Sequence, residues 1–186
     1  MTPFDLVMFL ALFAMFVVGY AQGITRRLLG IAAILFSLVL AAQLRNPLGG
    51  YLASEWTNLP ADYGYMVGFL AVFVASAVTL SFGIQISYKP APLLWRYPVL
   101  DELLGGVLGV IEGLIIFMAL VIIFDPYYGG STLGGVSGEF QPLRQLAQFM
   151  QGSLFDDIFR QTIVPGLFAV LGFLFPTSTV DFFKVH

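Results

Sequence analysis

Long apolar stretches dominate the first two thirds of the chain, and short polar or proline-containing segments separate them. A helix needs about 20 apolar residues to cross the hydrocarbon core of a bilayer. Four stretches reach or approach that length: Phe4 to Ala21, Leu28 to Leu44, Tyr65 to Ser87, and Leu103 to Phe124. The pattern predicts an all-α, polytopic membrane protein whose residues 1–125 form a domain of four transmembrane helices.

Small residues recur every fourth position inside these stretches, which places them on one face of a helix. Gly105, Gly109 and Gly113 form such a ridge in the fourth stretch, and Gly19 and Gly23 repeat the spacing in the first. In a membrane, small residues let two helix backbones approach closely. We therefore expect helix contacts at these glycines, within one protomer or between protomers. Weaker stripes occupy the other two stretches: Ala33, Ser37, Ala41, Gly64, Gly68, Ala71, Ala75 and Thr79.

The last third of the chain is different in character. Residues 126–141 are interpreted as a Gly/Ser-rich linker, and residues 142–186 as a tail of amphipathic and interfacial helices. The tail is expected to break at Gly152-Ser153, because Ser153 and Asp156 have the spacing of a capping box. The apolar run from Ile163 to Phe175 is short for a span, so we interpret it as interfacial or re-entrant, with a fifth spanning helix as the alternative.

Composition supports the membrane class and excludes several kinds of site. Apolar residues make up 59% of the chain and charged residues 10%, against about 25% charged in soluble domains. The net charge of -3 gives no support to nucleic-acid binding. There is no Cys, His186 is the single histidine, and no catalytic or nucleotide-binding motif is present. We expect no enzyme activity, no cofactor and no metal site.

Basic residues between the stretches predict the orientation of the protein. Arg26 and Arg27 follow the first stretch, and Lys89 and Arg96 follow the third. Lys and Arg are enriched in cytoplasmic loops. This distribution places both of these loops in the cytoplasm and both termini outside it.

Glu112 lies near the middle of the fourth stretch, where an isolated charge costs about 2.5–3.5 kcal/mol on insertion scales. It must be protonated, paired or facing water. Two interpretations remain open: a proton- or cation-responsive group lining a polar cavity, and a neutral acid hydrogen-bonded to a neighbouring helix. Possible partners by depth and chemistry are Gln22, Gln43, Gln85, Ser37, Ser76, Thr79 and Ser81.

Two blocks of the sequence suggest a family. Gly19-x-x-x-Gly23-x-x-Arg26, followed by Asp101-x-x-Leu104-Gly105-x-x-x-Gly109-x-x-x-Gly113, resembles the bacterial colicin V production protein (CvpA) family over roughly residues 4 to 125. The resemblance implies a small multi-pass inner-membrane protein linked to colicin V production or export. Asp101 belongs to the shared pattern, although capping the start of the fourth helix is sufficient to explain it. In this family a basic residue can replace Glu112, which argues against a shared acid chemistry.

Three function classes follow. The first is an assembly or scaffold factor in toxin production or export and in envelope maintenance. The second is a small oligomeric channel or transporter that uses Glu112, and the third is a structural accessory subunit of a larger membrane complex. The expected partners are the lipid bilayer and other membrane proteins or further copies of the chain.

Overall fold

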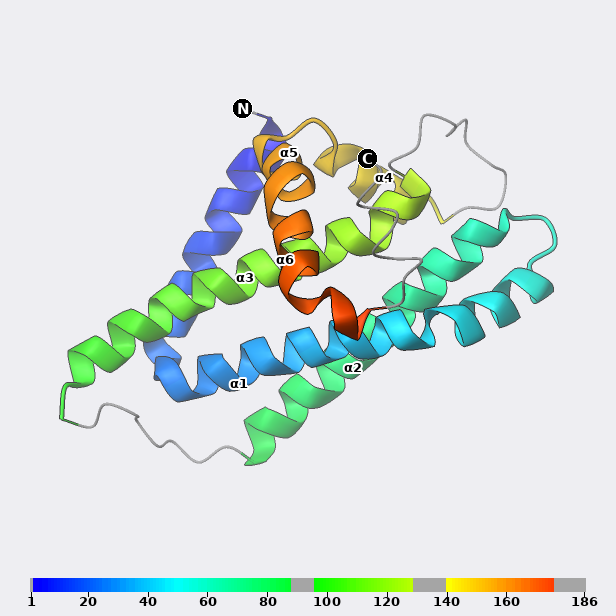
Figure 1. Ribbon diagram of the computed structural model, residues 1–186. Helices are drawn as coiled ribbons and strands as arrows, with labels where there is room; N and C mark the ends of the chain where they lie inside the picture. The colour runs from blue at the N-terminus through cyan, green and yellow to red at the C-terminus, as the bar shows by residue number, and fades with distance from the viewer. Residues whose placement is uncertain (1, 88–95, 129–139, 176–186) are drawn as a thin grey trace.

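The protein is all-α, as a computed structural model that describes residues 2–87, 96–128 and 140–175 shows. Three of the described helices are long and apolar enough to cross a membrane: α1 (Pro3–Glu55), α2 (Ala61–Ser87) and α3 (Pro98–Tyr128). The tail contains α4 (Gln141–Met150), α5 (Leu154–Ile158) and α6 (Val164–Leu171). Helix α1 contacts both α2 and α3 and is the centre of the arrangement (Figure 1).

The first two predicted spans are the two halves of α1, which bends sharply at Gly23. Gly23 has φ 74° and ψ 175°, a non-helical conformation that glycine adopts without steric cost. The two halves run in different directions (Figure 1). The predicted loop between the spans is therefore wrong: Arg26 and Arg27 lie in the first turn of the second half.

The second half of α1 also continues past Leu44, where the predicted span ends. It runs through Asn46-Pro47-Leu48-Gly49-Gly50, a segment rich in helix breakers, and reaches Glu55. Packing against α2 explains the difference. A Cβ atom placed on Gly68 of α2 would lie 3.0 Å from the backbone nitrogen of Gly49, so the two helices touch through their backbones. One missing donor at Pro47 does not outweigh that contact.

The small-residue stripes divide into buried and exposed parts. Ala33, Ser37 and Ala41 of α1 are buried, and the Ser37 hydroxyl donates to the Ala33 carbonyl at 2.8 Å. Gly64 and Gly68 of α2 face α1. The rest of the α2 stripe is exposed: Ala71, Ala75 and Thr79.

Helix α3 is longer than predicted at both ends. It begins at Pro98, so Asp101 lies inside its first turn and is not the N-cap residue. It ends at Tyr128, so residues 126–128 of the predicted linker are helical, and Gln141 at the other end of that linker is the first residue of α4. Lys89, residues 129–139 of the linker and His186 lie outside the described residues.

The tail packs against the membrane helices. As predicted, it breaks at Gly152, which has φ 73°, and the Ser153 hydroxyl accepts a hydrogen bond from the Asp156 amide at 3.0 Å. From Leu154 the chain continues through a π-helical turn (Phe159–Ile163) and α6 to Leu174, crossing α3 (Figure 1). The Phe159 ring packs edge-on against Phe117 of α3 with centroids 4.8 Å apart.

Hydrogen bonds fix both ends of this tail segment. The Leu154 amide donates to Asp5 at the start of α1 at 3.0 Å, and the Gln43 side chain donates to the Leu174 carbonyl at 2.9 Å. Among the described residues, this segment is not one of the helices long enough to span.

Candidate functional site: a bent-helix seam and a polar cavity

The glycine ridge of α3 packs against the first half of α1 within one protomer. A Cβ atom placed on Gly105 would lie 2.6 Å from the carbonyl oxygen of Gly19. A Cβ atom placed on Gly109 would lie less than 3.0 Å from the Met15 carbonyl oxygen, which is closer than real Cβ atoms approach. Gly113 faces the side chains of Leu12 and Met15. We call this contact the seam, formed by Leu12, Met15, Gly19 and Gly23 of α1 and Gly105, Gly109 and Gly113 of α3.

Asp101 extends the seam to the bend of α1. Its carboxylate is buried and lies directly against the Cα of Gly23, where a side chain of any size would collide with it. Because Gly23 interrupts the helix, a new helix begins after it, and a negative charge is favourable at that end. The bend thus needs Gly23 both for its positive φ and for the space that Asp101 occupies.

Glu112 forms an ion pair with Arg27. Nη1 of Arg27 donates to Oε2 of Glu112, and the two residues are only 5% and 9% exposed. Gly30 provides the room, because a Cβ there would lie 2.5 Å from Oε1 of Glu112. The structure therefore gives Glu112 a charged partner. All the candidate partners named from the sequence were uncharged.

The bend explains why the sequence did not reveal this pair. Along the seam the helices are antiparallel, since Leu12 meets Gly113, Met15 meets Gly109 and Gly19 meets Gly105. A straight α1 in that register would carry Arg27 past the start of α3 and away from Glu112. The turn at Gly23 brings the second half back alongside α3, and no periodic signal in the sequence encodes that reversal.

A polar cavity adjoins the pair. It lies between the bend of α1, the last turns of α2 and the middle of α3. Its volume is about 180 Å³. Its lining includes the Arg27–Glu112 pair and Gly30, and further residues from α1 and α2: Gln22, Arg26, Ser81, Ile84 and Gln85. Three of the candidate partners of Glu112 named from the sequence, Gln22, Ser81 and Gln85, are thus in the same cavity lining. Arg96 precedes α3 and is exposed, outside this lining.

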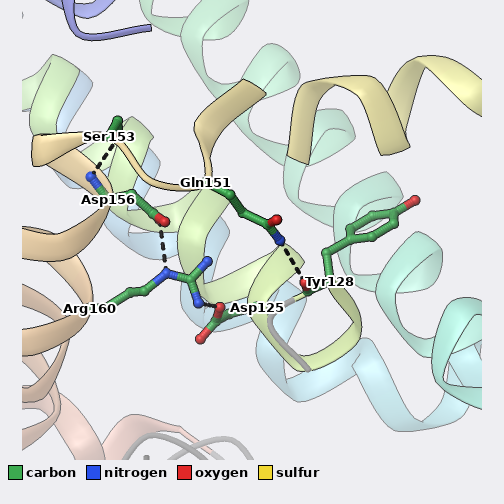
Figure 2. A network of polar contacts seen from close by, with 6 residues as sticks. All are labelled: Asp125, Tyr128, Gln151, Ser153, Asp156 and Arg160. Atoms are coloured by element: carbon green, nitrogen blue, oxygen red, sulfur yellow. Dashed lines mark hydrogen bonds and ion pairs between the residues drawn. The ribbon is translucent and has the colours of Figure 1, made fainter. Parts of the chain in front are cut away.

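A second polar cluster joins the tail to α3 (Figure 2). The Arg160 guanidinium pairs with Asp125 of α3 and, through Nε at 2.9 Å, with Asp156 of the tail. The Gln151 side chain donates to the Tyr128 carbonyl at 2.7 Å. Burial raises the pKa of Asp156 to about 6, the negative charge of Asp157 adds to the rise, and a hydrogen bond from the Gly152 backbone opposes it.

The described residues contain no group of three or more acidic or histidine side chains that could hold a metal ion. What they define is a class of protein: an α-helical membrane protein organised around one sharply bent helix. A family model, that of the colicin V production protein, matches residues 4–131. The chain belongs to this family. No curated protein and no solved structure matches the chain.

The matched region contains the whole seam, the ion pair and the cavity lining, and it ends shortly after α3. The docked tail lies outside it. Both sequence blocks that suggested the family meet each other in the structure, since Gly19 and Gly23 of the first contact Gly105 and Asp101 of the second.

Proposed function

We propose that this protein is an assembly or scaffold factor of the bacterial inner membrane that acts in colicin V production or export and in envelope maintenance, without enzymatic activity. Membership of the colicin V production family supports the link to that toxin. Two structural observations favour a scaffold: the glycines of the two sequence blocks form a backbone-to-backbone seam, and the intramembrane acid is paired with a buried arginine. The glycines and the ion pair thus hold the helices together.

The same proposal includes a topology, with the bend of α1 in the cytoplasm and both termini outside. Two sets of contacts support it. The bend lies against the start of α3 and, through the cavity, near the end of α2. The other ends also meet: the start of α1 bonds to the tail through Asp5, and the Tyr63 hydroxyl near the start of α2 accepts from the Phe140 amide at 3.0 Å.

The topology can be tested directly because the chain has no native cysteine. Single cysteines at Arg96 and at Gln141, both exposed, are labelled with a membrane-impermeant maleimide in intact spheroplasts. We expect labelling at position 141 and protection at position 96 until the membrane is opened. Labelling at 96 alone contradicts the proposed orientation.

The scaffold role requires a stable assembly in the membrane. Gentle extraction followed by mass measurement of the intact particle should give either a homo-oligomer or a complex with a stoichiometric membrane partner. In cells that depend on this chain for colicin V export, Gly109→Leu should abolish secretion, and Gly83→Leu should not, because Gly83 faces open space. A monomer that restores secretion by itself contradicts a scaffold.

A channel or transporter remains the second candidate, because Glu112 lines a polar cavity. It predicts ion or proton flux in liposomes containing the purified protein and a loss of that flux in Glu112→Gln. Equal, background flux in both proteins would exclude it. An accessory subunit, the third candidate, is distinguished by a stoichiometric partner in a native pull-down.

A further inference from the structure

We propose that the polar cavity is a binding site for a phosphate group. The site is defined by Gln22, Arg26, Arg27, Ser81 and Gln85. The phosphate site itself does not depend on the proposed scaffold role, whereas the choice of a lipid as its source rests on the proposed topology. At about 180 Å³ the cavity is smaller than the roughly 300–1,000 Å³ of pockets for drug-sized ligands, and it suits a small polar group.

The buried arginine is the first observation that indicates a ligand. Arg27 is only 5% exposed, and its Nη1 is used by Glu112, yet its Nε has no hydrogen-bond partner among the described residues. A buried donor without an acceptor is costly, and the cost is greater for a charged group. Arg27 also lines the cavity, so its guanidinium places a positive charge beside any group that binds there.

The charge and chemistry of the lining define the ligand. Two arginines and one glutamate leave a net charge of +1, and the carboxylate is already matched by Arg27. The remaining polar groups can all donate: the half-buried Arg26, the amides of Gln22 and Gln85, and the Ser81 hydroxyl. An anion with several acceptor oxygens uses such a set fully, and arginine forks match phosphate geometry.

The position of the cavity favours a lipid as the source of the phosphate. It lies at the last turns of α2, next to strongly exposed apolar side chains such as Phe82 and Ile86. Basic pockets between transmembrane helices on the cytoplasmic side are typical sites for anionic headgroups. Under the proposed topology this cavity faces the cytoplasmic leaflet. Free phosphate presents the same chemistry, so the experiment separates the two sources.

The test uses the full chain in nanodiscs and counts retained lipid by native mass spectrometry after limited delipidation. Nanodiscs contain phosphatidylglycerol or phosphatidylcholine. Both lipids carry a phosphate diester, but the choline cation neutralises it in phosphatidylcholine, so we expect phosphatidylglycerol to be retained preferentially. Arg26→Gln should weaken that retention about five- to tenfold, which is the effect of one arginine near an anionic headgroup. Arg96→Gln removes the same charge outside the cavity and should leave retention unchanged. The Arg26→Gln substitution leaves the Arg27–Glu112 pair intact, so we expect the variant to fold. Thermal unfolding of the variant in phosphatidylcholine nanodiscs checks this.

A second variant separates the cavity from general surface charge. Ser81→Leu fills space in the lining without altering charge, and it should weaken retention as Arg26→Gln does. Inorganic phosphate at millimolar concentration is added to the wild type and to Arg26→Gln. If it displaces the lipid, or stabilises the wild type and not Arg26→Gln, free phosphate is also a ligand. Equal effects of Arg26→Gln and Arg96→Gln, or full retention in Ser81→Leu, would overturn the site.

Discussion

Two arginine–carboxylate clusters lie at different places on α3. They differ in the elements that they join and in how far their side chains are buried. Arg27 and Glu112 join two membrane helices, with side chains 6% and 11% exposed. Arg160 joins the tail to Asp125 and Asp156, and its side chain is 29% exposed. The first pair lies within the family match and the second reaches outside it. The comparison indicates that the seam region is a fixed structural unit, whereas the tail docks through an interaction that solvent and protons reach.

The largest expected effect comes from filling the seam. In Gly109→Leu the new side chain meets the Met15 carbonyl, and backbone cannot move aside as a flexible side chain does. Overpacking costs about 1–3 kcal/mol where the surroundings can adjust, and more where they cannot. Because rigid backbone faces Gly109, we expect a cost above that range, with loss of folded protein in membranes. Thermal unfolding in detergent measures it. Gly166→Leu in the tail, where nothing lies within 4 Å, is the control and should remain folded. Equal behaviour of the two variants would show that the seam is not a backbone contact.

Removing one arginine at a time sharpens the comparison. Arg27→Gln leaves the Glu112 carboxylate buried without its charged partner, which is expected to destabilise by about 3–5 kcal/mol. Arg160→Gln should cost less, because that side chain is partly exposed. The double variant Arg27→Gln/Glu112→Gln should recover much of the loss. Denaturant unfolding of the wild type, Arg27→Gln, Glu112→Gln and the double variant measures the coupling. Strictly additive losses in this cycle would mean that the pair does not stabilise the fold.

The sequence predicted the apolar helices and the docking role of the α3 glycines, because both depend on local composition and spacing. It did not predict that α1 continues through Pro47 or that Arg27 meets Glu112. Both depend on contacts between residues far apart in the chain: Gly68 against Gly49, and the second half of α1 folded back at Gly23. The cap assigned to Asp101 failed for a related reason. Its carboxylate faces the bend of another helix, which no pattern within α3 reveals.

Protonation should distinguish the tail cluster from an ordinary ion pair. The pKa of Asp156 is raised from 3.8 to about 6, so the folded state binds a proton more tightly than the unfolded state. The stability from this group is complete below about pH 4 and is lost as the pH rises through 6. Tail amides in α4–α6 should therefore exchange hydrogen more slowly at pH 5 than at pH 7, after correction for intrinsic rates.

Two variants test the direction of this pH dependence. Asp156→Asn should remove the pH dependence, because the side chain is neutral throughout. Asp157→Asn should keep the dependence and move its midpoint to lower pH, since the charge of Asp157 contributes to the rise. If the pairing with Arg160 dominated, acid would loosen the tail instead, and faster exchange at pH 5 would reject the burial argument.

The smallest expected effect concerns a single hydrogen bond, and it asks whether the tail and the seam are independent. Gln151→Ala removes the donor to the Tyr128 carbonyl at the end of α3, a partly buried bond worth about 1 kcal/mol. Gln148→Ala, an exposed neighbour in α4, is the matched control. If docking is local, exchange in α4–α6 rises only in Gln151→Ala, while amides around Gly105 and Gly109 keep their protection. Loosening of the seam in the same variant would show that the two regions form one cooperative unit, because a defect at the far end of α3 would then reach the bend of α1.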